Sequence, residues 1–176
     1  MLTLSDDDLI KYIDERELGI DPFPAEEAIN ANSIDLRLGS VLLEYLPQTI
    51  QLNNTEVETR EIDMQVERGY VLGPGEFILG TTLEEVSLSG RFAGHIETKG
   101  NIARAGIQVH NNDGHIDPGF RGHITLEITN LQKRVSIKLI PGMYICQLFI
   151  YPISSPSKRP YRGKYYGQVK PSPYRP

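Results

Sequence analysis

The sequence predicts a mainly β protein, a distorted antiparallel barrel or jelly-roll-like sandwich with one helix near its N-terminus. Short apolar runs of strand length recur along the chain, and helical periodicity is clear in one place only. Pro-Gly pairs at 74–75, 118–119 and 141–142 separate several of the runs and are typical of turns. Many short strands joined by regular turns are typical of β-barrels and sandwiches.

The first element is a helix expected from Ser5 to about Leu18. Ser5 followed by Asp8 has the spacing of a capping box, and acids at 6–8 suit the positive end of a helix. Apolar residues at 9, 10 and 13 supply one helical stripe. Gly19 and the prolines at 22 and 24 end it.

The strands are expected to follow in order. Their ranges are 33–39, 41–45, 69–72, 76–82, 91–97, 106–110, 122–129, 134–140 and 144–151. Segment 46–68 is polar and is interpreted as a loop with room for one edge strand. The clearest strand is 122–129, where Ile124, Leu126 and Ile128 share one face. Glu127 lies on the opposite, polar face, which makes it a candidate acid or base.

Length and composition indicate a single domain over residues 1–176. The chain is 39% hydrophobic and 23% charged, as in ordinary soluble globular proteins. It has no apolar run of transmembrane length, and its N-terminus lacks the basic start and apolar block of a signal peptide. Cys146 is the only cysteine, which excludes an internal disulfide and fits a reducing compartment. We therefore expect a cytoplasmic protein with no membrane partner.

Charge is unevenly distributed along the chain. The formal net charge of −5 argues against general nucleic-acid binding. Residues 152–176 contain no acid, and they carry six basic residues with tyrosines between them: Lys158, Arg159, Arg162, Lys164, Lys170 and Arg175, with Tyr161, Tyr165, Tyr166 and Tyr174. This tail is interpreted either as a segment that binds an anionic ligand or as a solvated, disordered segment.

Several familiar sites are absent from the sequence. The histidines at 95, 110, 115 and 123 do not have the spacing of helical metal ligands, and Cys146 has no partner, so no metal site is predicted. There is no Gly-x-Ser-x-Gly elbow, P-loop or dinucleotide fingerprint. Lys99 and Arg104 flank a small-residue turn, Gly100-Asn101, that could bind phosphates.

Two segments carry a family resemblance. Residues 97–106, ETKGNIARAG, and 116–127, IDPGFRGHITLE, resemble the signature of the dCTP deaminase branch of the trimeric dUTPase superfamily. That signature reads Glu-Gly-Arg-Ser-Ser-x-x-Arg-x-Gly, then Ile-Asp-Pro-Gly-Phe-x-Gly-x-Ile-Thr-Leu-Glu. Similar segments lie at 4–6, 33–39, 74–77, 141–143 and 160–168. The resemblance implies a dUTPase-like β fold and a homotrimer whose sites lie between subunits. It also implies a flexible C-terminal tail.

The same resemblance implies an activity. Its members deaminate dCTP to dUTP and ammonia without zinc, and some continue to dUMP and diphosphate. By position, Glu127 is the general base, Arg104 supports the reacting centre, and Asp117 lies near the sugar. Magnesium accompanies the triphosphate, and dTTP is a candidate inhibitor. The remaining implied substrate-binding positions are Lys99, Gly100, Asn101, Ile102, Ala103, Asp113, Thr125, Leu126 and, in the tail, Tyr161, Lys164 and Gln168.

The sequence also departs from the family signature. Gly100 and Asn101 replace two serines, Lys99 replaces an arginine with loss of its bidentate fork, and Asp113 adds an acid near the pyrimidine. Glu127 favours a deaminase, whereas Gly100 favours one of two alternatives. These are a dUTP diphosphatase and a trimeric nucleotide-binding protein that has lost catalysis.

Overall fold

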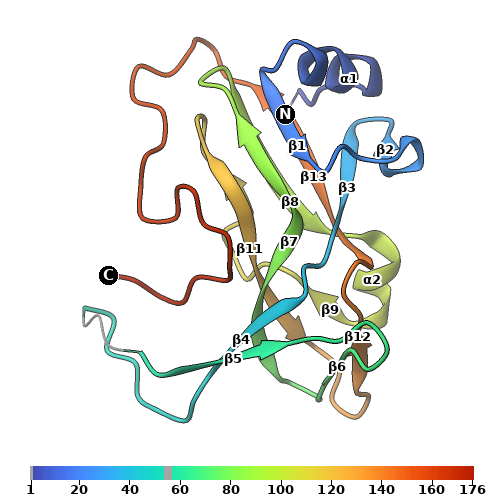
Figure 1. The fold of residues 1–176 in the computed structure, drawn as a ribbon, viewed down its shortest axis with the longest axis vertical. Coiled ribbons are helices and arrows are strands. Elements are labelled where there is room, and N and C mark those ends of the chain that lie inside the picture. The colour runs from blue at the N-terminus through green and yellow to red at the C-terminus, as the bar shows by residue number, and fades with distance from the viewer. Residues whose placement is uncertain (1, 54–56) are drawn as a thin grey trace.

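The computed structural model describes residues 2–53 and 57–176, and strands make up most of its regular structure (Figure 1). The helical elements are α1 (Asp6–Asp14), the 3-10 turn η1 (Glu26–Ala28) and α2 (Gly100–Ala105). The strands are β1 (Leu18–Asp21), β2 (Ile29–Asn30), β3 (Ser33–Arg37), β4 (Val41–Tyr45), β5 (Thr59–Asp63), β6 (Tyr70–Leu72), β7 (Phe77–Leu88), β8 (Phe92–Thr98), β9 (Ile107–Gln108), β10 (His115–Ile116), β11 (Arg121–Asn130), β12 (Ile137–Leu139) and β13 (Tyr144–Pro152).

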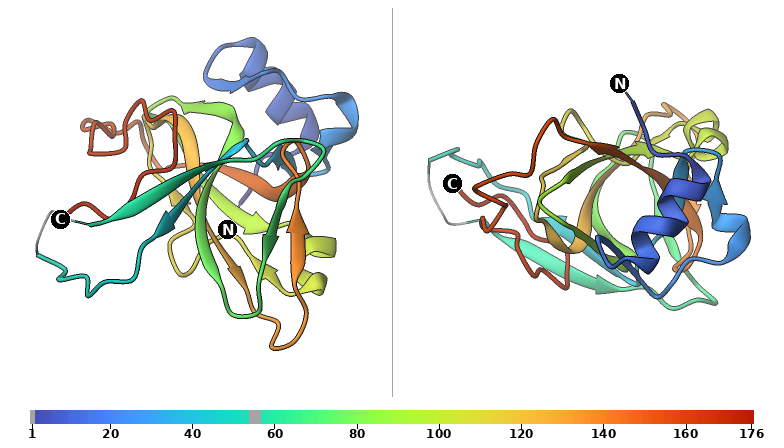
Figure 2. Two further views of the ribbon diagram at one scale, coloured as in Figure 1. Left: turned by 60° about the horizontal axis from the view of Figure 1, so that its bottom comes forward. Right: turned by 90° about the horizontal axis from the view of Figure 1, so that it is seen from above.

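Two antiparallel sheets enclose the core. One has the order β5-β4-β7-β11-β9, with β1 also paired to β7, and the other has the order β10-β8-β13-β3-β2. A small third sheet pairs β12 with β6. Seen from above, the strands curve around a common interior, so the predicted mainly β, distorted barrel architecture is confirmed (Figure 2).

The core lies between the inward faces of these sheets. Ile34 and Leu36 of β3 and Leu148 of β13 are fully buried, and they belong to one cluster with Leu126 and Ile128 of β11. Burial along β11 alternates residue by residue, as period-two patterning requires. The prediction that Glu127 lies on the face opposite the core residues is therefore confirmed.

The N-terminal helix is present but shorter than predicted. Ser5 caps it, since its Oγ accepts a hydrogen bond from the amide of Asp8 at 3.3 Å. The helix ends at Asp14, and Arg16 then takes a positive φ of 60° that turns the chain. Leu18, the expected last residue of the helix, instead begins β1, because Leu18–Asp21 pair with the end of β7 and bury Leu18 and Ile20.

Other boundaries also differ from the predictions. The edge strand allowed for in 46–68 is β5, although residues 54–56 of that segment lie outside the described chain. The strands expected at 106–110 and 134–140 shrink to β9 and β12. The Gly100-Asn101 turn is the start of the short helix α2, which ends at Gly106 with φ of 97°.

The last 24 residues form no helix or strand, yet they follow a defined course beside β11. Gly167 donates from its amide to Arg121 O at 2.7 Å, and His123 donates from its amide to Gln168 O at 3.0 Å. Within the described part of the chain, no helix combines the length and apolarity that a membrane crossing requires.

Candidate functional site

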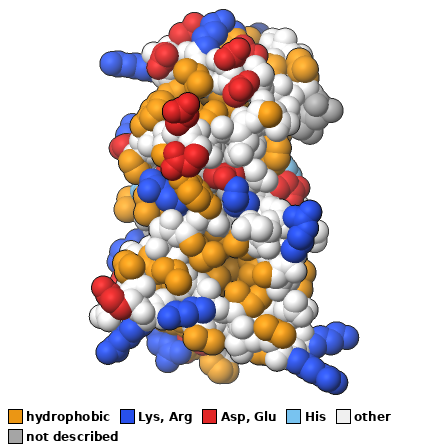
Figure 3. All heavy atoms as spheres, turned by 90° about the vertical axis from the view of Figure 1, so that its right-hand side faces the viewer, with side chains coloured by type: hydrophobic (Ala, Val, Ile, Leu, Met, Phe, Trp, Pro, Cys, Tyr) orange, Lys and Arg blue, Asp and Glu red, His pale blue; other side chains and the backbone are white. Residues whose placement is uncertain are grey.

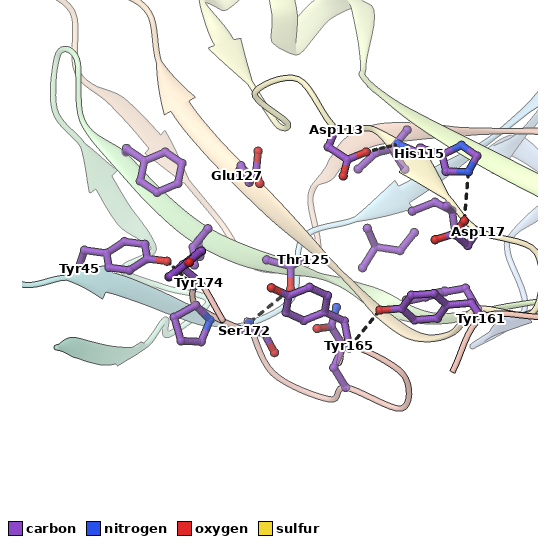
Figure 4. A pocket seen from close by; sticks show the side chains of 18 residues that line it. Tyr45, Asp113, His115, Asp117, Thr125, Glu127, Tyr161, Tyr165, Ser172 and Tyr174 are labelled. Carbon is purple, nitrogen blue, oxygen red and sulfur yellow. Dashed lines mark hydrogen bonds and ion pairs between the residues drawn. The ribbon is translucent and has the colours of Figure 1, made fainter. Parts of the chain in front are cut away.

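A cavity of about 480 Å³ opens between β11 and the C-terminal tail (Figure 4). Its floor comes from Thr125 and Glu127 of β11 and from Phe77 and Leu79 of β7. One end is formed by the segment around Asp113, His115 and Asp117, and tyrosines close the remaining sides: Tyr45, Tyr161, Tyr165 and Tyr174. Aromatic rings around a few polar groups are a common construction for sites that bind small molecules.

Glu127 is held in a defined position in this cavity. Its amide donates to Val109 O at 2.8 Å, and its carboxylate Oε2 accepts from the amide of Asn111, also at 2.8 Å. Both contacts come from the segment that follows β9. Among the described residues, no hydrogen bond involves the second oxygen, Oε1. A half-buried carboxylate with one oxygen fixed and the other unengaged can accept a proton from a bound water.

Asp113 and Asp117 lie on either side of His115 at the other end of the cavity (Figure 4). The amide of His115 donates to Asp113 Oδ1 at 3.3 Å, and His115 Nε2 lies 3.5 Å from Asp117 Oδ1. His115 Nδ1 is 3.1 Å from the hydroxyl of Tyr151. Burial and the charge of Asp117 raise the pKa of Tyr151, so its hydroxyl stays protonated at neutral pH. His115 thus joins a neutral phenol to a carboxylate.

The tail contributes the opposite wall. The amide of Tyr161 donates to Pro118 O at 2.8 Å, and its ring packs against Phe120 with 6.1 Å between centroids. Gln168 Nε2 donates to His123 O at 2.6 Å. Further on, Ser172 donates from its amide to Thr125 Oγ1, and Tyr174 donates to the hydroxyl of Tyr45. The predicted tail residues Tyr161 and Gln168 therefore line the cavity.

Two glycines of the IDPGFRG segment allow the C-terminal tail to lie close to β11. A Cβ at Gly119 would lie 2.5 Å from the Cβ of Pro160, and one at Gly122 would lie 3.0 Å from the backbone nitrogen of Gln168. Both glycines have positive φ values, 89° and 146°. Larger residues at either position would push the tail away from β11.

A second group of predicted residues lies elsewhere. Positions 100–104 belong to α2, which is on the opposite side of the molecule from the tail (Figure 1). None of them lines the cavity. Arg104 is exposed, and its Nη1 donates to Gly100 O at 3.0 Å. Lys164 is also exposed and donates to Arg175 O at 3.2 Å, while Leu126 is fully buried in the core.

Lys99 makes an ion pair with Asp35. The Asp35 carboxylate is only 5% exposed, and it also accepts from Gln147 Nε2 and Asn30 Nδ2, each at 3.0 Å. The ammonium of Lys99 thus compensates a buried negative charge at the start of α2. In this chain it is not oriented toward the cavity.

The cavity is acidic. Its lining includes the carboxylates of Asp113, Asp117 and Glu127, and no lysine or arginine is among its described lining residues. A highly charged anion would be repelled by such a site in isolation. The positive charge that a phosphate ligand needs must therefore come from a bound cation or from residues that do not line this cavity.

Comparison with known proteins identifies the family. The family model for dCTP deaminase-like proteins matches residues 3–153. The chain belongs to the dCTP deaminase-like family. A relative named "dCTP deaminase, dUMP-forming" from Methanosphaera stadtmanae is 38% identical over 97% of this chain and 92% of its own. One of the same name from Mycobacterium ulcerans is 41% identical over 99% of this chain and 95% of its own.

Solved structures share the fold of this dCTP deaminase-like chain. The crystal structure of 2'-deoxycytidine 5'-triphosphate deaminase from Agrobacterium tumefaciens has a TM-score of 0.63 over 84% of this chain, at 19% identity. This chain spans about half the length of that protein, 47%. A dUTPase mutant from phage phi11 of S. aureus has a TM-score of 0.54 at 14% identity, covering 83% of this chain and 97% of its own.

Several residues that line the cavity of this dCTP deaminase-like chain are absent from the site expected from the sequence. Tyr45 and Phe77 reach it from β4 and β7, and no local motif marks either one. His115 stands between the two predicted acids, so the motif itself could have indicated it. Tyr165 and Tyr174 belong to the basic, aromatic tail, and only the folded path of the tail brings them to the cavity.

Proposed function

We propose that the chain converts dCTP to dUTP and ammonia and then releases dUMP and diphosphate. The observation that carries this proposal is Glu127, a carboxylate fixed through one oxygen to the amide of Asn111 on the wall of an aromatic cavity. The family assignment and the dUMP-forming relatives support the same reaction. Residues 1–176 form a single domain in this proposal, with residues 152–176 closing the cavity.

Deamination needs a group that moves a proton twice. Glu127 takes a proton from water as the water oxygen bonds to C4 of cytosine, which gives a tetrahedral carbon bearing both OH and NH2. The carboxylic acid then returns its proton to the amino nitrogen. The C–N bond breaks and ammonia leaves. The hydroxyl proton is then carried by Glu127 to N3, which gives the C4 carbonyl and the N3–H of dUTP. Charge on the tetrahedral centre requires a nearby cation, the role proposed for Arg104.

The second step is hydrolysis at the α-phosphate. Asp117 lies at the far end of the cavity from Glu127 (Figure 4). Water activated by Asp117 attacks the α-phosphorus, the bond to the β-phosphate oxygen breaks, and dUMP and diphosphate form.

Magnesium is the proposed companion of the triphosphate. Asp113 and Asp117 place carboxylate oxygens at one end of the cavity, and Mg²⁺ prefers oxygen ligands, so the residues present fit the ion. When bound, the ion neutralises phosphate charge that would otherwise face an acidic wall. Zinc has no place in the proposed chemistry.

The complete site is proposed to form between subunits of a homotrimer. The predicted residues divide into the cavity group with Glu127 and the α2 group with Arg104, on opposite sides of one chain. An interface that joins two different faces closes into a ring when the rotation permits. Such an interface would place Arg104 of one subunit against the acidic cavity of the next. Arg104 would then supply the positive charge that the cavity lining lacks.

The surface around α2 supports this arrangement. Hydrophobic side chains gather over the lower half of the face that contains α2 (Figure 3). Exposed apolar residues lie on or beside β6, β12 and the end of β11: Val71, Leu131, Val135 and Ile140. Apolar residues collected on one face are typical of protein interfaces.

Product analysis tests the reaction. The purified protein is incubated with magnesium and either dCTP or dUTP, and the products are separated by chromatography, with and without dTTP as a candidate inhibitor. We expect ammonia, dUMP and diphosphate from dCTP. Cleavage of dUTP without ammonia release from dCTP would establish the diphosphatase alternative. That alternative is favoured by Gly100, which has no hydroxyl where the family has serine.

Subunit mixing tests the shared site. Glu127→Gln and Arg104→Ala chains, each inactive alone, are refolded together in equal amounts. If each site takes one residue from each of two subunits, about a quarter of the sites regain both groups through random assembly around a closed ring. If one chain supplies both residues, mixing restores nothing. Scattering from the wild-type protein must also give the mass of a trimer.

A further inference from the structure

We infer that His95, Glu97 and His110 form a binding site for a single transition-metal ion of the zinc type. The ligand atoms of these three residues all lie within 4.8 Å of one another. His95 Nε2 is 3.1 Å from Glu97 Oε1, and His110 Nε2 is 3.2 Å from Glu97 Oε2. The site is separate from the cavity, since none of the three residues lines it.

The folded chain explains why sequence spacing did not reveal this cluster. His95 and Glu97 are two residues apart on β8, so their side chains project from the same face of the sheet. His110 comes from the segment after β9, and its ring meets that of His95 edge-on with 5.7 Å between centroids. Neither spacing resembles the helical patterns from which metal sites are usually recognised.

The local backbone already fixes the separation between the two elements. The amide of Val109 donates to Thr98 Oγ1 at 3.1 Å, and the amide of Ile96 donates to Gly114 O at 2.9 Å. The segment 109–114 is thereby tied to β8 at both ends. A Cβ at Gly114 would lie 2.8 Å from His95 Cε1, so glycine there leaves room for the imidazole.

The donor set suits zinc in kind and spacing. Two imidazole nitrogens and a carboxylate are common zinc ligands, at about 2.0–2.2 Å from the ion. Nitrogen and oxygen atoms 3.1–3.2 Å apart are at the separation that two ligands of one tetrahedral ion adopt. Glu97 and His95 are 52% and 38% exposed, so a water can complete the coordination from solvent. His110, 16% exposed, forms the inner edge.

The charges favour a cation as well. Glu97 supplies a carboxylate, and each of its two oxygens faces one imidazole nitrogen. Within the described chain His110 Nδ1 is buried without a hydrogen-bond partner, so the ring's polar contact is made through the nitrogen that faces Glu97.

A bound ion would stiffen one particular segment. His110 stands between Val109 and Asn111, whose backbone groups make the two contacts to Glu127. Coordination would tie this segment to β8 through a side chain in addition to the backbone contacts at its ends. The proposal concerns metal binding, and it stands or falls independently of the deamination reaction.

Metal titration of the whole protein tests the inference. Metal-stripped protein is titrated with Co²⁺, with visible absorption as the readout, and then with Zn²⁺, which should displace the cobalt. We expect one site per chain, with Mg²⁺ not competing because it prefers oxygen ligands. Amide exchange at residues 109–114 should slow when zinc is added.

Each ligand is replaced in turn in the variants His95→Ala, Glu97→Gln and His110→Ala. Each replacement should weaken cobalt binding by more than about tenfold, because even the loss of a residue that hydrogen-bonds to a metal ligand weakens binding by that much. His115→Ala is the matched control, because it removes an exposed histidine outside the cluster. Circular dichroism of each variant confirms that it folds. Absence of cobalt binding by the wild type, or binding unchanged in all three ligand variants, overturns the inference.

Discussion

The carboxylate of Glu127 and the backbone amide of Asn111 form a 2.8 Å hydrogen bond that joins the middle of β11 to the segment after β9. An amide can only donate, so Oε2 of the carboxylate is the acceptor in this contact. The same contact fixes the rotamer of Glu127 relative to the cavity. The contact therefore governs the position of the proposed general base.

Replacing that base should stop deamination. Glu127→Gln keeps the size of the side chain and an oxygen for the Asn111 amide, but it cannot accept a proton. We expect ammonia release from dCTP to fall by about a hundredfold to ten-thousandfold, the usual contribution of a general base. Nucleotide affinity, measured by calorimetry, should remain close to wild type. Ammonia release at nearly the wild-type rate would remove Glu127 from this role.

Replacing Asp117 should separate the two reactions. Asp117→Asn removes the proposed base for phosphate hydrolysis, so dUMP formation should fall by about a hundredfold or more. Ammonia should still be released, and dUTP should accumulate in chromatograms. Asp113→Asn is the control, since it lies in the same cavity beside His115. If Asp113→Asn blocks dUMP formation and Asp117→Asn does not, the assignment of the two acids is reversed.

Metal dependence should follow the proposed chemistry. Removal of magnesium should lower activity because three cavity carboxylates would then face an unscreened triphosphate. A zinc-selective chelator should leave the steady-state rate of ammonia release unchanged, even if it empties the histidine cluster. Inhibition by that chelator, reversed by zinc and not by magnesium, would contradict the zinc-independent mechanism.

Asn130 should be important for stability. Its side chain is fully buried, and Nδ2 lies within 3.1 Å of the carbonyl oxygens of Leu72, Gly73 and Val135. Asn130→Ala would leave these carbonyls without that donor, at about 1–3 kcal/mol for each buried group left unsatisfied. We expect a lower denaturation midpoint in urea. If the urea midpoint falls no more than it does in the exposed control Gln51→Ala, the loops around Asn130 rearrange without loss of stability.

Cys146 should be inert in the folded protein. It is fully buried in β13, and burial raises the pKa of its thiol well above the usual value. The reactive species is the thiolate, so alkylation should be undetectable in native protein and rapid after unfolding. Mass spectrometry after timed exposure to iodoacetamide measures both. Rapid native labelling would indicate that β13 opens locally.

The sequence predicted the β architecture and the placement of Glu127 because both depend on strict alternation in long strands such as β11. It did not predict β1, because the pairing of Leu18 with Leu88 depends on a partner 70 residues away. It did not predict α2, whose six residues are too few for a helical period to be visible. Local motifs identified Asp117 and Gln168, whereas Tyr45 and Phe77 required the folded sheet.

The contacts between the tail and β11 also bear on solubility. Gly167 and Gln168 occupy backbone groups of Arg121 and His123 that would otherwise form an open strand edge. An open edge can pair with the same edge of another molecule and begin aggregation. A chain shortened before residue 160 would thus expose the unpaired edge of β11 and would also leave the cavity uncovered. Such a truncation can lower activity by aggregation through this edge or by loss of the cavity wall. Light scattering distinguishes the two, because only aggregation raises the particle mass.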